Sequence, residues 1–286
     1  MNNRLRRNTK WYVVNIKSRD VQTPQRYIDA FTQLNVQDPL VLLRGSRHIS
    51  IKSFQRSQYL DCNGYPRALY LKLSAYDILN PDAFYNRRQR ESVSLQLDPD
   101  IVANEKETEI IFVPSVHRLA FRTATPISLS YIVKYFSDGL SMVDGEGHFD
   151  VHVVKDHDVI ERILMSHEIF KIDAVISYSN ADPSLGFHNV LDNKLRRARA
   201  SRMRMTFEGT REQPLQAEDD GMIAAIVGIS ESNGCVEARV RETENANIST
   251  IKTKDYPLKM DVQITDRADG FTDAYNELVS RFGNNS

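Results

Sequence analysis

The stretch FDVHVVKDHDVIERILMSHEIFKIDAVISY, residues Phe149–Tyr178, decides the fold. Apolar and polar residues alternate over 149–154 and again over 172–178, which predicts two strands. Between them, 159–167 has the apolar spacing of a helix. This order of strand, helix and strand predicts an α+β protein of two lobes, with mixed or mostly antiparallel sheets and helices packed on one face.

The same signals continue on both sides of this stretch. Thr23-Pro24 and Thr125-Pro126 each predict the start of a helix, because Thr caps a helix and Pro suits its first position. Turn residues separate the remaining elements. We expect further strands at 11–16, 40–44, 48–54, 67–73, 109–113, 117–122, 236–241, 249–254 and 258–264, and further helices at 81–85, 187–202, 222–229 and 271–282.

Residues 92–107 are polar and acidic and read as a connection between the lobes. The prediction is therefore a basic α+β N-terminal lobe over 1–91 and a larger α+β lobe over 108–286. The larger lobe would contain a basic helix over 187–204.

Composition favours a folded cytoplasmic protein. The chain has 286 residues, of which 41% are hydrophobic and 26% charged, as is usual for globular proteins. Its apolar runs are far shorter than the ~20 residues of a membrane span, and its polar, basic start does not resemble a signal peptide. The isolated Cys62 and Cys235 favour a reducing compartment.

Charge is distributed unevenly along the chain. The first 90 residues contain sixteen Lys/Arg, six Asp and no Glu, a charge of +10, whereas residues 91–286 contain 21 basic and 32 acidic residues, a charge of −11. Such asymmetry favours contact with a polyanion. The alternative is that the two parts of the chain attract each other.

The basic residues form several clusters that we predict to contact nucleic acid, DNA rather than RNA. Contacts of this kind are made to phosphates and give little sequence specificity. The alternatives are a solvated surface or pairing with the acidic segment 208–220. The candidate residues are Arg4, Arg6, Arg7, Lys10, Arg44, Arg47, Lys52, Arg56, Arg87, Arg88, Arg90, Lys194, Arg196, Arg197, Arg199, Arg202 and Arg204.

One pattern offers different chemistry. On a strand, His148, Asp150 and His152 share one face and could hold a divalent metal. The rival function is a metal-dependent nuclease or phosphodiesterase. A half-buried strand shows the same alternation without any metal. No nucleophile elbow or phosphate-binding glycine loop is present, so we expect no cofactor and assign no catalytic residue.

Several short segments resemble a bacterial family known as domain of unknown function 4747. They are Asn15-Ile16-Lys17, Arg26-Tyr27, Leu43-Arg44-Gly45, Phe112-Val113-Pro114, His117-Arg118-Leu119, Ser179-Asn180-Ala181-Asp182, Ser232-Asn233-Gly234, Ser249-Thr250 and Tyr256-Pro257. The resemblance spans most of the chain and implies an association with anti-phage or abortive-infection loci. In size and layout it is also broadly similar to the phage-exclusion protein RexA and the Kiwa component KwaB.

These resemblances imply a dimeric DNA-binding sensor or regulator that passes its signal to an effector protein from the same locus. They supply no catalytic residues. A third interpretation is a scaffold or toxin–antitoxin-like protein, in which the basic third of the chain docks an acidic protein.

Overall fold

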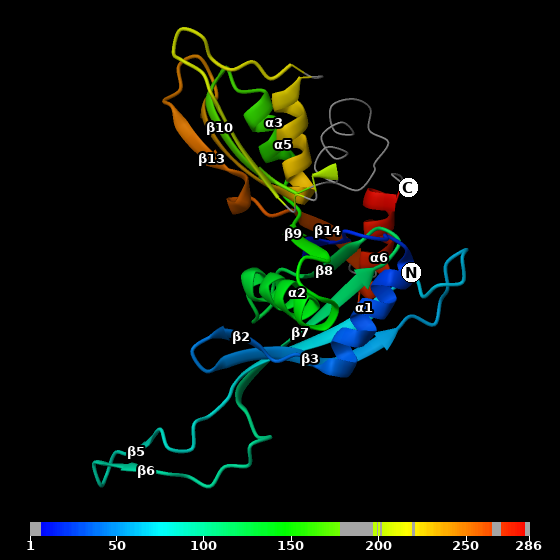
Figure 1. The fold of residues 1–286 in the computed structure, drawn as a ribbon, viewed down its shortest axis with the longest axis vertical. Helices are drawn as coiled ribbons and strands as arrows, with labels where there is room; N and C mark the ends of the chain where they lie inside the picture. Colours follow the sequence, from blue (N-terminus) through cyan, green and yellow to red (C-terminus); the bar gives the residue numbers. More distant parts are fainter. Residues whose placement is uncertain are drawn as a thin grey trace, which may run out of the picture.

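The computed structural model describes residues 7–177, 197–198, 200, 202–218, 221–264 and 270–283. It confirms the α+β class: the described strands pair antiparallel throughout, and helices pack on two separate sheets (Figure 1). None of the described helices is long and apolar enough to cross a membrane.

Eight strands form the larger sheet. Seven follow the order β14-β1-β8-β7-β4-β3-β2, and β9 pairs with the second half of β1, so that both ends of the described chain meet in one sheet. The strands are β1 (Arg7–Ser18), β2 (Val41–Arg44), β3 (Arg47–Arg56), β4 (Leu69–Asp77), β7 (Ala103–Val113), β8 (Arg118–Arg122), β9 (Phe149–Val153) and β14 (Lys259–Ile264).

Two helices, α1 (Pro24–Gln37) and α2 (Leu129–Asp144), cover one face of this sheet. A stacked pair of rings anchors α1 to the sheet: the ring of Phe31 lies 4.3 Å from that of Phe112 in β7, measured between centroids. Thr23 caps α1 as predicted, accepting the N–H of Arg26. The second helix begins later than predicted, because Ser128 rather than Thr125 caps it.

The opposite face is covered by the C-terminal helix α6 (Phe271–Phe282), which has the predicted bounds. Side chains of β1 alternate between the two faces: Val14 faces α1 and α2, whereas Trp11 packs against Phe271 of α6. The larger sheet is therefore covered by helices on both sides, which differs from the expectation of helices on one face.

The smaller sheet has four strands in the order β11-β10-β12-β13. They are β11 (Met203–Glu208), β10 (Glu168–Ile176), β12 (Gly234–Arg241) and β13 (Ser249–Lys252), followed by the 3₁₀ turn η1 (Thr253–Asp255). Helices α3 (His157–Leu164) and α5 (Met222–Asn233) cover one face and enclose an apolar core.

Strand β11 corrects the end of the basic helix predicted over 187–204, because residues 203–208 pair with β10. In that pairing, side chains alternate between the core and solvent as in any half-buried strand. The rest of the predicted helix lies outside the described residues, apart from 197–198, 200 and 202.

The strand pairings cross the connection predicted at 92–107. Strand β4 precedes it and pairs with β7, and β1 pairs with β8, β9 and β14. The larger sheet thus draws strands from both predicted lobes. The chain passes from the larger sheet to the smaller sheet between β9 and β10, and it returns to the larger sheet at β14.

Between β4 and β7 the chain leaves the sheet as a projecting arm, residues 78–102 (Figure 1). Its far end is a small hairpin of β5 (Phe84–Asn86) and β6 (Glu91–Val93). The helix predicted at 81–85 is wrong. Asn80 and Pro81 begin a single turn, in which the Ala83 N–H donates to the Asn80 carbonyl at 3.1 Å, and the chain then extends into β5.

Candidate nucleic-acid interface

Three arginines crowd the tip of the arm. The connection between β5 and β6 contains Arg87, Arg88 and Arg90, all exposed. Asn86 organises this turn: its Oδ1 accepts the N–H of Arg88 at 3.0 Å, and its carbonyl accepts the N–H of Arg90 at 2.7 Å. The backbone of Arg90 is left-handed, with φ 58°. This tight turn therefore fixes the backbone positions of the three arginines.

The charge at the tip is not neutralised within the described part of the chain. None of the three guanidinium groups forms an ion pair or a hydrogen bond with another described residue, whereas many other cations of the molecule do. Tyr85, next to them on β5, is 62% exposed. The tip thus presents free guanidinium groups beside an exposed aromatic ring.

A fourth arginine lies near the root of the arm. Arg44 is the exposed last residue of β2, next to the turn in which Gly45 takes a left-handed φ of 60°. The N–H of Ile78, the first residue of the arm, donates to the carbonyl of Ser46 in this turn at 3.0 Å. Arg44 therefore lies at the end of the sheet from which the arm departs.

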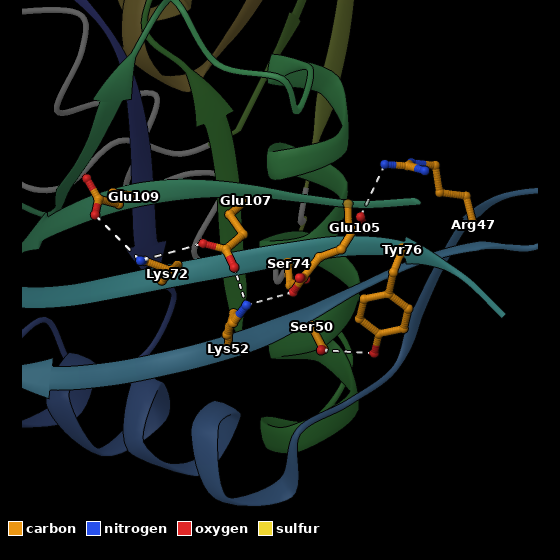
Figure 2. A network of polar contacts seen from close by, with 10 residues as sticks. Arg47, Ser50, Lys52, Lys72, Ser74, Tyr76, Glu105, Glu107 and Glu109 are labelled. Atoms are coloured by element: carbon orange, nitrogen blue, oxygen red, sulfur yellow. Dashed lines mark hydrogen bonds and ion pairs between the residues drawn. The ribbon is translucent and has the colours of Figure 1, made fainter. Parts of the chain in front are cut away.

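The other predicted residues on β3 are already paired. Figure 2 shows a ladder of charges across β3, β4 and β7, in which Lys52 contacts Glu105 at 2.9 Å and also contacts Glu107. Lys72 lies 3.6 Å from Glu107 and 3.8 Å from Glu109. Three carboxylates facing two ammonium groups leave no excess positive charge for phosphates.

Hydrogen bonds add to this neutralisation. The Ser74 hydroxyl donates to Glu105 at 2.7 Å (Figure 2), and this bond, followed by the contact with Lys52, lowers the pKa of the Glu105 carboxyl. Arg47 lies 3.4 Å from Asp77 and donates to the Ala75 carbonyl at 3.1 Å. Most of the basic residues predicted on β3 therefore form contacts within the sheet.

The remaining predicted residues lie on separate surfaces or outside the description. Arg56 donates to the Thr32 hydroxyl of α1 at 2.8 Å, Lys10 is exposed on β1, and Arg204 is exposed on β11 of the other sheet. Arg197 and Arg202 are exposed as well. Arg4, Arg6, Lys194, Arg196, Arg199 and the side chain of Arg7 lie outside the described residues.

The candidate metal ligands are directed to three different neighbours. Asp150 forms a two-pronged ion pair with Arg19 at 2.6 and 2.8 Å, His148 contacts Asp144 at 3.2 Å, and the His152 Nε2 lies 3.0 Å from the Ser177 hydroxyl. Within the described residues, no group of three or more His, Cys, Asp or Glu side chains is placed to hold a metal ion. This geometry does not favour the metal-dependent alternative.

The surroundings of His152 also favour its neutral form. Removal from water, followed by the nearby Lys155 ammonium, lowers the pKa of His152 to about 4. Burial likewise lowers the pKa of Lys155 to about 8, and its Nζ donates to the carbonyl of Gly234. His152 is thus a neutral, hydrogen-bonded side chain at neutral pH.

Sequence reasoning missed a buried polar junction where the two sheets meet. The Asn15 Nδ2 on β1 donates at 3.1 Å both to the Ser232 carbonyl and to the Asn233 Oδ1, at the end of α5. Its Oδ1 accepts a hydrogen bond from Arg118 of β8. The only hint in the sequence is an amide within the apolar strand 11–16, because the partners of Asn15 are distant along the chain.

Comparison with known proteins identifies the chain by family. No curated protein matches it. A family model described as Domain of unknown function (DUF4747) matches residues 7–280, which include both sheets and the arm. The chain therefore belongs to the DUF4747 family.

Proposed function

We propose that the protein binds duplex DNA through the tip of its arm, as a sensor or regulator in bacterial anti-phage defence. The observation that supports DNA binding is the group of three exposed arginines on a projecting hairpin, without ion pairs in the described part of the chain. Among the other predicted residues that the structure describes on the larger sheet, Arg47 and Lys52 are paired with carboxylates.

The shape of the arm favours DNA over RNA. The major groove of B-form DNA admits a two-stranded β-ribbon. The major groove of A-form RNA is too deep and narrow for side chains to enter and read. Guanidinium groups bind phosphate oxygens in pairs and also bind guanine edges, so Arg87, Arg88 and Arg90 suit both the backbone and the groove.

The rest of the proposal concerns the cellular role. Phosphate contacts give weak sequence specificity, which suits a protein that detects foreign DNA rather than one operator. The family resemblance supports a defence role in the bacterial cytoplasm, with signalling to an effector protein. In a homodimer, two arms would engage one duplex, and the linked contacts would raise its apparent affinity.

The proposal is tested by fluorescence anisotropy with a short labelled duplex. The test variant replaces the three tip arginines, Arg87→Gln, Arg88→Gln and Arg90→Gln. We expect at least about tenfold weaker binding at ~0.1 M salt, because three phosphate contacts are lost.

A matched control removes the same charge elsewhere. Lys254→Gln, Lys259→Gln and Arg281→Gln change exposed cations far from the arm, and this variant should bind as the wild type does. Equal loss in both variants would show that net charge alone drives binding. Failure of the wild type to bind duplex DNA would refute the proposal.

A further inference from the structure

A second basic site lies on the smaller sheet, far from the arm. A pocket of about 260 Å³ is lined by three cations, Lys171, Arg211 and Arg239, together with Glu208, Phe170 and Ile248. None of these residues belongs to the proposed DNA-binding surface, and none was among the predicted contacts to nucleic acid.

Two of the cations oppose each other across neighbouring strands. Lys171 of β10 and Arg239 of β12 are direct partners in the antiparallel register. Like charges in such a pair repel and destabilise a sheet. Lys171 is compensated by Glu208 at 2.9 Å and by Asp173 at 3.4 Å. Arg239 has no ion pair with any described residue.

A tight turn brings the third cation to the same pocket. After β11, the N–H of Gly209 donates to the Phe170 carbonyl at 2.9 Å, and the N–H of Thr210 donates to the Gln213 carbonyl at 3.0 Å. Arg211 lies within this turn, exposed and without an ion pair to a described residue. Two unneutralised guanidinium groups thus line one pocket.

A β-bulge shapes the apolar wall. The register of β10 against β12 shifts between Ile169 and Lys171, which sets Phe170 apart from the regular pairing. The neighbouring Arg241 bonds to Glu168 at 2.5 Å and lies over the Phe170 ring, 5.7 Å from its centre. The wall therefore comes from Phe170 and the half-buried Ile248.

We propose that this pocket binds a small phosphate monoester, of the size of a nucleoside monophosphate. Arg211 and Arg239 bind the phosphate, because guanidinium groups form paired, charge-assisted hydrogen bonds with phosphate oxygens. Glu208 holds Lys171 at the edge of the site, and the three cations still exceed this one carboxylate. The organic part of the ligand packs against Phe170 and Ile248.

Isothermal titration calorimetry on the full chain tests this site with adenosine 5′-monophosphate, adenosine and inorganic phosphate. The monophosphate should bind most tightly, since only it offers both the charge and the apolar surface. Arg239→Gln and Arg211→Gln should each weaken its binding at least about tenfold. Arg204→Gln removes an exposed cation of β11 that does not line the pocket and should leave binding unchanged.

Three outcomes would overturn the proposal: no binding of the monophosphate to the wild type, equal binding of adenosine, or unchanged affinity in both pocket variants. The proposal is independent of DNA binding by the arm. Arg239→Gln should keep the wild-type affinity for duplex DNA, so either proposal can fail alone.

Discussion

At the scale of single residues, Asn15 shows how the two sheets are joined. It is fully buried, and its amide bonds to the backbone and side chain at the end of α5, while its oxygen accepts from Arg118. All of its hydrogen-bonding groups are thus satisfied across the boundary between the sheets. A buried polar group that loses such partners incurs the full cost of its removal from water.

Replacing this residue should destabilise the whole fold. We expect Asn15→Ala to lower the free energy of unfolding by about 3 kcal/mol, because Arg118 and the α5 carbonyl lose a buried partner. Urea unfolding followed by circular dichroism measures the change. Asn8→Ala, at an exposed position of the same strand, is the matched control and should have little effect. Equal stability of the two variants would contradict the assigned role of Asn15.

Two partly buried histidines predict how stability depends on pH. Burial, followed by nearby cations, lowers the pKa of His117 and of His152 to about 4 each, below the 6.5 of an unfolded histidine. The unfolded chain therefore takes up more protons between these values. This part of the stability is present above pH 6.5 and is lost as the pH falls toward about 4.

His152 allows a direct test of this pH dependence. Wild-type stability should fall by up to about 1.4 kcal/mol per pH unit for each histidine as the solution is acidified. Unfolding titrations at several pH values should show a shallower fall in His152→Gln. Asn8→Ala, which changes no titratable group, should keep the wild-type dependence. Identical curves for the wild type and His152→Gln would refute this assignment.

Which basic residues stay free could not be predicted from the sequence. Arg47 and Lys52 look no different from Arg87 and Arg88 in a list of cations. The acids that pair with Lys52 are 53 and 55 residues further along the chain, and strand pairing alone brings them together. The free arginines were included in the prediction, but the sequence could not separate them from the paired ones.

At the scale of elements, the arm is distinct because none of its residues belongs to the three apolar cores. An isolated two-stranded hairpin is at best marginally stable in water, and Tyr85 and Ile101 leave more than half of their surfaces exposed. The arm therefore adds nothing to the described apolar cores, which is consistent with the role that we propose for it.

Removal of the arm should therefore spare the fold. Asp77 and Ala103 are direct partners across β4 and β7, so the two-residue turn Asn-Gly can replace residues 78–102. We expect the melting temperature to stay within about 3 °C of the wild type, while affinity for duplex DNA falls as in the arginine variant. Calorimetry and anisotropy measure the two effects. Unfolding on deletion would show that the arm supports the sheet.

Elements with strong local signals were predicted well. The cap at Thr23 and the helix Phe271–Phe282 follow from local sequence alone, and the structure confirms both. The helix predicted at 81–85 is wrong because Asn80 and Pro81 resemble a helix start, but no apolar helical face follows them that could pack on the sheet. Strand order depends on contacts between distant segments, which no local pattern reports.

At the scale of the whole molecule, ion pairs within the fold explain part of the uneven charge. Many cations of the first 90 residues pair with acids beyond residue 90, as in Arg19–Asp150, Arg26–Asp144 and Lys52–Glu105. Much of the asymmetry is thus attraction between parts of the fold. The basic charge left over in this region includes Arg44 and the tip of the arm. The arm projects from the larger sheet on the side away from the smaller sheet (Figure 1).

We propose that DNA is held by phosphate contacts at the arm tip. The most direct test is the slope of log affinity against log salt concentration, measured from about 50 to 200 mM for the wild type and for the Arg87, Arg88 and Arg90 glutamine variant. Each lost phosphate contact reduces the slope by about 1, so we expect the slope of the variant to be shallower by about 3. Parallel lines for the two proteins would contradict it.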